Sequence, residues 1–144
     1  ITDGAAARLV MSAERARDLD LTPVARIAAS AQAAVKPLDL FDAPPAAIRK
    51  LLHKTETTLD DYDLFEINEA FAAQMLANGQ ALGLDWDRVN VNGGAISLGH
   101  PIGASGARVL VTLIHALQER SGRRGLAALC LGGGEAVAMS VEML

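Results

Sequence analysis

The sequence of 144 residues is poor in cysteine, in aromatic residues and in positive charge. Its one cysteine, Cys130, cannot form an internal disulfide and cannot by itself build a structural zinc site, so we expect no metal centre and a reducing, cytoplasmic setting. Lysine and arginine number 13 against 17 aspartate and glutamate residues, a net charge of −4, which excludes the clustered basic surface that nucleic-acid binding requires. No run of about 18 uncharged apolar residues occurs, so we expect no membrane-spanning segment.

Hydrophobic residues make up 51% of the sequence, which is enough to offset the entropy of ordering the chain, and the length is typical of one domain. The sequence begins Ile1-Thr2-Asp3-Gly4, without an initiator methionine, a signal-peptide charge or an apolar leader. We therefore expect one domain over residues 1–144 that is part of a longer protein.

Apolar periodicity and turn residues predict strands that alternate with helices. Residues 24–35 are rich in alanine but alternate in polarity, which favours a strand. In the first part of the chain we expect a buried strand at residues 4–11, a helix capped by Ser12, a strand at 24–35, a loop at 37–45 and a helix begun by Pro44 and Pro45. In the middle we expect a strand at 64–67, a helix at 69–82, a strand at 89–92 and an irregular stretch at 93–106. The last part should form a helix from 105 to about 117 and strands at 126–131 and 136–141. This order is typical of an α/β fold, with the last two strands forming an antiparallel hairpin at one edge of the sheet.

Three clusters place a reactive side chain where a strand meets a turn. The first is Asn68-Glu69-Ala70-Phe71, directly after the predicted strand at 64–67. Asn68 is suited to capping the next helix, but its amide can equally donate a hydrogen bond to a carbonyl oxygen or hold a water that does so. On the local sequence alone Phe71 is expected to be a core residue.

The second cluster is a glycine-rich stretch, residues 92–108, with His100 held between Gly99 and Pro101. The glycines allow the backbone to approach a ligand closely, and the pattern is neither a dinucleotide-binding fingerprint nor a phosphate-binding loop, which requires a lysine. His100 is therefore a candidate site residue, whereas His53 and His115 lie on predicted helices and are read as ordinary surface or core residues.

The third cluster is Cys130, followed after one residue by the triple glycine 132–134. A lone cysteine is usually a small apolar core residue. Here the glycines expose backbone N–H groups beside the sulfur, so the thiol could move protons while the N–H groups stabilise an oxyanion.

Together the three clusters resemble the C-terminal half of a thiolase, the family of acetyl-CoA acetyltransferases and 3-ketoacyl-CoA thiolases. The resemblance covers nearly the whole chain and rests on Ile1-Thr2-Asp3-Gly4-Ala5-Ala6-Ala7, Asn68-Glu69-Ala70-Phe71, Gly99-His100-Pro101 with Gly103-x-Ser105-Gly106-x-Arg108, and Cys130-x-Gly132-Gly133-Gly134. One departure is Glu135-Ala136, where the family often has a further glycine. The resemblance implies a layered α/β fold with a mixed sheet covered by helices, one half of a five-layered enzyme.

It also implies reversible Claisen condensation of CoA thioesters in fatty acid metabolism, with no permanently bound cofactor. By motif, His100 would activate a nucleophilic cysteine, Cys130 would remove or return the α-proton, and Asn68 would hold a water that polarises the thioester oxygen together with His100. The Gly132 N–H would serve a second oxyanion hole. The substrate-binding residues implied are Phe71, Ala70 and Gly99, and the family usually forms homodimers or homotetramers.

The mechanism implied by the resemblance needs two cysteines, and the chain has one. We therefore expect the nucleophile to belong to an N-terminal domain absent from this chain, the isolated chain to be inactive, and an apolar face to meet the missing half. A ketoacyl synthase is a weaker alternative because those enzymes have no catalytic cysteine at this place. A non-catalytic module that binds acyl-CoA or lipid, or serves assembly, is the alternative from another class.

Overall fold

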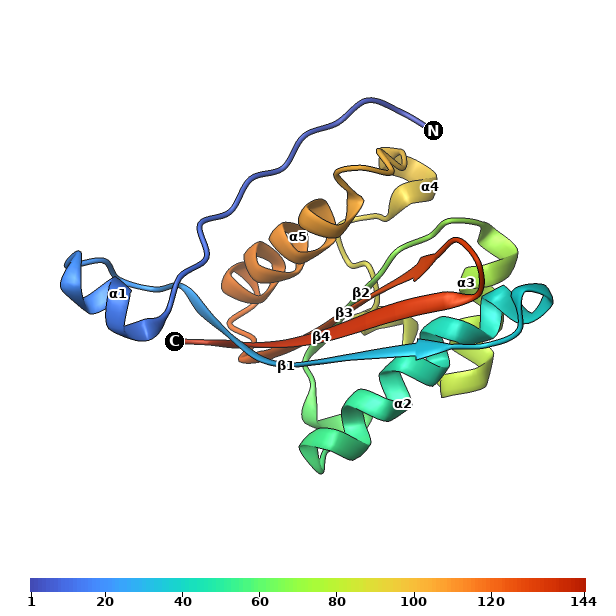
Figure 1. Ribbon diagram of the computed structural model, residues 1–144, viewed down its shortest axis with the longest axis horizontal. Helices are drawn as coiled ribbons and strands as arrows, with labels where there is room; N and C mark the ends of the chain where they lie inside the picture. Colours follow the sequence, from blue (N-terminus) through green and yellow to red (C-terminus); the bar gives the residue numbers. More distant parts are fainter.

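A four-stranded mixed sheet in the order β1-β4-β3-β2 organises the chain in the computed structural model, which describes all residues 1–144 (Figure 1). The strands are β1 (Ala25–Ala34), β2 (Leu64–Ile67), β3 (Arg124–Leu131) and β4 (Glu135–Met143). β4 pairs antiparallel with both β1 and β3, while β2 runs parallel to β3. The carboxyl ends of β2 and β3 therefore lie at the same edge of the sheet.

Helices cover both faces of this sheet (Figure 1). They are α1 (Ala13–Asp18), α2 (Ala43–Thr55), α3 (Ala72–Leu82), α4 (Ala95–Leu98) and α5 (Ser105–Glu119), with short 3₁₀ helices at Pro37–Asp42, Leu59–Asp61 and Trp86–Arg88. α2 packs on β1, β4 and β3, and α5 packs on β2, β3 and β4 from the other side. None of these helices combines the length and the hydropathy that crossing a membrane requires.

Two apolar cores follow from the period-two alternation of the strands. Phe65 and Ile67 of β2 belong to the larger core, which includes Ile48 and Leu51 of α2. Leu64 points to the other face, into a smaller core that Val109, Leu110, Leu113 and Leu117 of α5 fill. Glu66 and Asn68 share the parity of Leu64, so the strand directs both toward the α5 side.

Most predicted elements form where they were expected. Strand 24–35 appears as β1, Ser12 accepts a hydrogen bond from the Arg15 backbone N–H at 3.1 Å as the N-cap of α1, and Pro44 and Pro45 lie in the first turn of α2. The antiparallel hairpin of β3 and β4 is confirmed. Its predicted position at the sheet edge is wrong, because β1 pairs with the outer side of β4 and β2 with that of β3.

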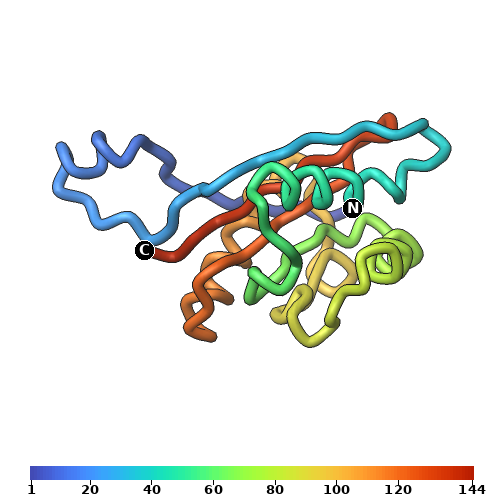
Figure 2. Tube along the Cα trace, turned by 90° about the horizontal axis from the view of Figure 1, so that it is seen from below, coloured from blue at the N-terminus to red at the C-terminus, as the bar shows by residue number.

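The strand predicted at residues 4–11 does not form, because the segment pairs with no strand of the sheet. The segment runs extended beside α5 toward α1, with Leu9 and Val10 exposed by 80% and 61% (Figure 1). In the view from below, the N-terminus lies over the body of the molecule, and α1 projects beyond it (Figure 2). We call residues 1–12 the N-terminal arm.

Three further boundaries differ from the predictions. The strand predicted at 89–92 is reduced to one bridge between Phe65 and Val89, because Asn90 adopts a left-handed conformation with φ of 48°. The helix predicted at 69–82 begins three residues later, at Ala72. Residues 37–42 of the predicted loop form a 3₁₀ helix, and the irregular stretch at 93–106 contains the four-residue helix α4.

Candidate active site

The candidate site lies at the edge of the sheet where the parallel strands β2 and β3 end. Asn68 follows β2 directly, and its backbone N–H donates to the Ala128 carbonyl of β3 at 2.9 Å. Cys130 is two residues further along β3. The register of two neighbouring strands thus places these two residues beside each other in the backbone.

The Asn68 side chain is buried and contacts His100. Its Nδ2 atom lies 3.4 Å from His100 Nε2, and its Oδ1 atom is buried and accepts no hydrogen bond. The N-cap of α3 is Phe71, which makes no side-chain cap bond, so the interpretation of Asn68 as a helix cap is wrong. A buried amide oxygen without a donor is costly, which favours a role in holding a water or a ligand group.

His100 is fixed from its other side by Ser105, the first residue of α5. The His100 Nδ1 atom lies 2.6 Å from Ser105 Oγ, and Ser105 Oγ also donates to the Pro101 carbonyl at 3.0 Å. We assign the single hydroxyl proton to the Pro101 carbonyl; in this arrangement Ser105 accepts from His100, and Nδ1 carries the ring proton. The Nε2 atom that faces Asn68 therefore has a free lone pair and can act as a base.

Burial lowers the pKa of His100, and the positive charge of Arg108 lowers it further. The imidazole is consequently neutral at pH 7, the form that can accept a proton. The two partners that contact His100, Asn68 and Ser105, are themselves uncharged.

The glycine loop and the N-terminal arm pack closely against each other. Gly99 has a φ of 95°, and a Cβ atom there would lie 2.3 Å from Thr2 Cγ2. A cavity of about 440 Å³ is lined by residues 2–6 of the arm together with residues 101–104 and Ala107. Residue 99 must therefore be glycine both for its backbone conformation and for the close approach of the arm.

Glu69 and Asn90 hold the loop to the end of β2, a role that sequence reasoning missed. Asn90 accepts from the Ile67 N–H at 2.8 Å and donates to the Ile67 carbonyl at 2.9 Å. The Glu69 carboxylate accepts from Asn90 Nδ2 at 2.8 Å and from the Ile96 N–H at 2.9 Å. A Cβ at Gly94 would meet this carboxylate at 2.2 Å, which explains a second glycine. The only indication of this role in the sequence was that Glu69 belongs to the motif Asn68-Glu69-Ala70-Phe71.

Cys130 is half-buried, and burial raises the pKa of its thiol. Its side chain shares the parity of Leu126 and Ala128, which face the α2 side, and its sulfur makes no hydrogen bond to Asn68 or His100. The structure thus brings Asn68 and His100 into contact and places Cys130 on the adjoining strand end, protonated at neutral pH.

The remaining predicted residues surround this edge. Gly132 is exposed, and a Cβ there would meet no atom within 4 Å. Phe71 is 62% exposed, and its ring is tilted by 45° to that of Phe41 with 5.9 Å between the centroids, so its interpretation as a core residue is wrong. Ala70 is half-buried, and its N–H donates to Gln74 Oε1 at 3.1 Å. No three His, Cys, Asp or Glu side chains gather closely enough to hold a metal ion.

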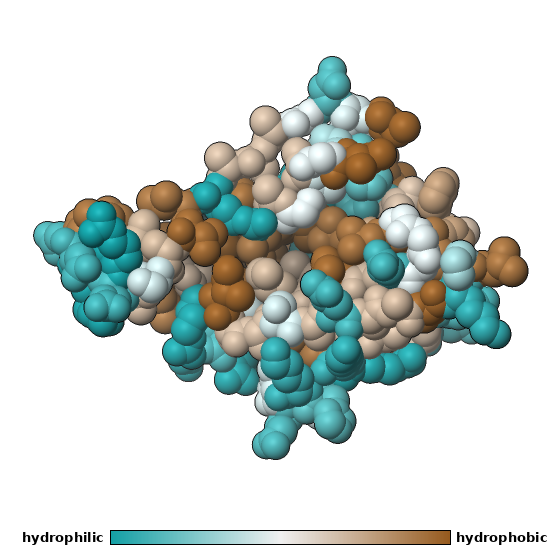
Figure 3. Space-filling view, viewed as in Figure 1, coloured by the Kyte–Doolittle hydropathy of each residue, from teal (hydrophilic) through white to brown (hydrophobic).

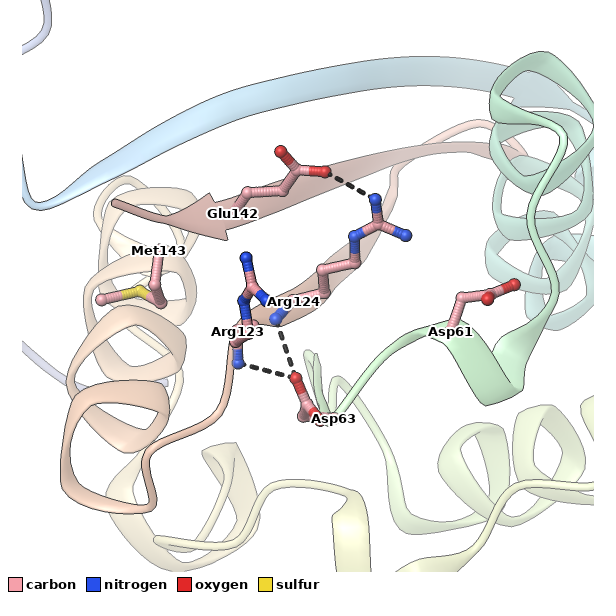
Figure 4. Close-up of a pocket in the computed structure, with 6 residues that line it drawn as sticks. All are labelled: Asp61, Asp63, Arg123, Arg124, Glu142 and Met143. Atoms are coloured by element: carbon pink, nitrogen blue, oxygen red, sulfur yellow. Dashed lines mark hydrogen bonds and ion pairs between the residues drawn. The ribbon is translucent and has the colours of Figure 1, made fainter.

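A second cavity, of about 360 Å³, lies at the opposite edge of the sheet, where β2 and β3 begin (Figure 4). Its charged groups bind one another: Asp63 accepts from the backbone N–H groups of Arg123 and Arg124 at 2.7 and 2.8 Å, and Arg124 pairs with Glu142 at 3.1 Å. Only the exposed Arg123 guanidinium lacks a partner here, and none of the motif residues lies at this edge, so the chemistry is assigned to the other edge.

The sequence model of the family described as "Thiolase, C-terminal domain" matches residues 21–143. The chain belongs to this thiolase family. The thiolase domain is 54% identical to the acetyl-CoA acetyltransferases of Cupriavidus necator and of Escherichia coli, over 99% and 100% of its length. The crystal structure of the Bacillus anthracis acetyl-CoA acetyltransferase superposes with a TM-score of 0.90 at 51% identity, covering 93% of this chain and 34% of that one.

The resemblance stated from the motifs and the predicted layered α/β fold are confirmed by these matches. The thiolase domain spans 36% of the length of each of the two curated relatives. The family match begins at residue 21, so it leaves out the N-terminal arm and α1. The motif with Asn68, the glycine loop with His100, and Cys130 all fall inside it.

Proposed function

We propose that this thiolase domain is the C-terminal catalytic half of an acetyl-CoA acetyltransferase, which condenses two acetyl-CoA molecules or cleaves a 3-ketoacyl-CoA with CoA. The observation that carries the proposal is the arrangement of Asn68, His100 and Ser105 beside the carboxyl end of β3, where Cys130 lies. It supplies a neutral imidazole with a free Nε2 and a protonated thiol from neighbouring strand ends. CoA thioesters are the substrates, and no resident cofactor is needed.

In this mechanism His100 Nε2 accepts the proton of a nucleophilic cysteine that lies outside this chain. The thiolate attacks the thioester carbonyl of one acetyl-CoA, CoA leaves as its thiol, and an acyl-enzyme remains. Cys130 gives its proton to the departing CoA sulfur, and its thiolate then removes an α-proton from the second acetyl-CoA. The carbanion attacks the acyl-enzyme, and the nucleophilic cysteine leaves and takes back the proton held by His100. In the cleavage direction the Cys130 thiol returns that proton, which its raised pKa keeps on the sulfur at neutral pH.

Stabilisation of the oxyanions is assigned to Asn68 and Gly132. The buried Asn68 Oδ1 has no donor, which supports a bound water that polarises the thioester oxygen together with His100. Gly132 is exposed and lacks a nearby side chain, so its N–H is open to a second oxygen. One such donor is worth about 3–4 kcal/mol in the transition state. Phe71, Ala70 and Gly99 line the approach of the acyl group and of the pantetheine arm.

The nucleophile is assigned to an N-terminal half that the relatives have and this chain lacks. Thr2 packs on Gly99, so a polypeptide that preceded residue 1 would pass next to His100. Exposed apolar side chains of the N-terminal arm, together with Ile102 at 67% exposure, provide a surface for that half. Apolar side chains gather across the middle of the face seen in Figure 3. Association into a homodimer or homotetramer, a cytoplasmic location and a role in fatty acid metabolism belong to the same proposal.

The test compares the isolated chain with the full-length gene product in thiolysis of acetoacetyl-CoA and of a long-chain 3-ketoacyl-CoA. We expect turnover by the full-length protein only. In that protein His100→Asn and Cys130→Ser should each lower kcat about 100- to 10,000-fold, whereas the matched histidine variants His53→Asn and His115→Asn should not. Wild-type kcat in Cys130→Ser, or thiolysis by the isolated chain, would contradict the assignment. Binding of acyl-CoA without turnover by the full-length protein would support the non-catalytic module instead.

A further inference from the structure

Beneath the Asn68–His100 contact, Glu66 of β2 and Arg108 of α5 form a buried ion pair. Arg108 Nη1 lies 2.9 Å from Glu66 Oε1, and the two side chains are only 16% and 2% exposed. In each of the other four ion pairs at least one side chain is 44% exposed or more. Arg108 Nη1 also approaches Thr112 Oγ1 at 3.5 Å, so one nitrogen carries both contacts.

This ion pair is poorly suited to stabilising the fold. Taking both charges out of water is costly, and apolar replacements of buried ion pairs are often neutral or stabilising. The contact is not bidentate, and Arg108 Nε and Nη2 are buried without an acceptor. Burial raises the pKa of Glu66 to about 7 against the opposing attraction of Arg108. A pair retained at such a cost is a candidate for a role in the site above it.

The position of the pair indicates what that role is. Glu66 precedes Asn68 by two residues on the same side of β2, and Arg108 lies one helical turn after Ser105, the residue that binds His100 Nδ1. The ion pair therefore joins the strand end that presents the Asn68 amide to the helix start that holds the His100 imidazole.

We propose that Glu66 and Arg108 are positioning residues, whose ion pair fixes the end of β2 against the first turn of α5 and so holds Asn68 at His100 Nε2. The expected effect of this ion pair on kcat rests on the proposed thiolase function. Its structural consequence, the geometry and titration of His100, does not depend on that reaction.

The charges around the two groups set the expected direction of the His100 titration. Arg108 is the positive side chain that acts on His100, while the direct neighbours of His100 are neutral. Glu66 faces Arg108 and, more distantly, Glu69. Because Glu66 with a pKa of about 7 is largely protonated where His100 titrates, Glu66→Gln should change the pKa of His100 little, whereas removal of the Arg108 charge should raise it.

The experiment uses Glu66→Gln, Arg108→Met and the double variant Glu66→Leu/Arg108→Met, with Glu142→Gln of the exposed Arg26 pair as matched control. The single variants leave one buried group unpaired and could fail to fold, but the double variant replaces both charges by apolar groups. In the isolated chain, nitrogen chemical shifts of the imidazole report the tautomer and the titration of His100. In the full-length protein, kcat and KM are measured separately.

We expect the double variant to match the wild type in its urea midpoint, yet to show a changed His100 titration and a kcat lower by about 10- to 100-fold at little-changed KM. Glu142→Gln should change neither. A double variant with wild-type His100 shifts and wild-type kcat would overturn the positioning role and leave the proposed function intact. A wild-type full-length protein without thiolase activity would refute the proposed function, while the His100 shifts would still decide the positioning role.

Discussion

Replacement of Glu66 by glutamine should flatten the pH dependence of the domain's stability between pH 5 and 8. Burial raises the pKa of Glu66 to about 7 from an ordinary value of 4.5. The native state therefore keeps a proton that the unfolded chain has already released in this interval. Because the native state binds more protons, the free energy of unfolding falls as the pH rises from about 4.5 to about 7, and then levels.

The size of this effect follows from the same pKa values. The difference between about 7 and 4.5 corresponds to about 3 kcal/mol at 1.36 kcal/mol per pKa unit. Glu66→Gln lacks the titration and should lack this fall, whatever constant offset the loss of the Arg108 contact adds. Glu142 has a pKa that its Arg26 partner lowers, so its contribution to stability is lost only as the pH falls through that lowered value.

The assay is urea denaturation of the isolated chain at closely spaced pH values, comparing wild type, Glu66→Gln and Glu142→Gln. The difference between wild type and Glu66→Gln should change steadily from pH 5 to pH 7, and the difference for Glu142→Gln should stay constant there. Parallel stability curves for wild type and Glu66→Gln would refute the reasoning. They would mean that Glu66 is ionised throughout, with the attraction to Arg108 outweighing burial.

Three further substitutions or modifications test the packing and the site. Gly99→Ala forces a side chain into a φ of 95° and should destabilise the domain by about 1–3 kcal/mol in urea denaturation, whereas Gly106→Ala, with open space around its Cβ, should be neutral or stabilising. Leu117→Ala empties a fully buried position and should cost about 2–5 kcal/mol, against less than about 1 kcal/mol for Leu76→Ala, which is 65% exposed. The raised pKa of Cys130 means that its alkylation rate should still be rising at pH 9.0, and a plateau below about pH 8 would contradict a protonated thiol.

The sheet shows which parts of a fold local sequence can and cannot specify. Alternation over residues 24–35 and the apolar runs on both sides of the triple glycine predicted β1, β3 and β4, because each pattern lies within one segment. The position of the β3–β4 hairpin within the sheet could not be predicted from such local patterns. β4 pairs with β1, which precedes it by about 100 residues, and nothing in either strand specifies that pairing.

Residues 4–11 show the converse case, a strand-like segment without a partner. The apolar run is real, but a strand needs a neighbour for its backbone N–H and C=O groups, and here the groups face solvent. Composition can report that a segment favours burial. Composition does not supply the surface that would bury the segment, and in this structure Leu9 and Val10 are exposed.

The residues of the candidate site likewise include some that local sequence identifies and some that it does not. Asn68, His100 and Cys130 were identified because strand ends, glycines and motifs mark them within short stretches of sequence. Glu66 was not identified, and Arg108 was quoted only as part of a motif, because an acidic residue in an apolar strand acquires meaning only from a partner 42 positions away. The same holds for Glu69 and Asn90, whose amide and carboxylate meet across 21 residues.

The chemistry of His100 depends on one proton whose place the sequence does not reveal. Because the Ser105 hydroxyl donates to the Pro101 carbonyl, it can only accept from His100, and this leaves the lone pair on Nε2. At 3.4 Å the Asn68 amide is too far away to engage that lone pair strongly, so Nε2 keeps its basicity. Burial keeps the ring neutral as well, by lowering its pKa. A serine hydroxyl one residue into a helix thus determines that the imidazole faces the Asn68 side of the site as a proton acceptor and not as a donor.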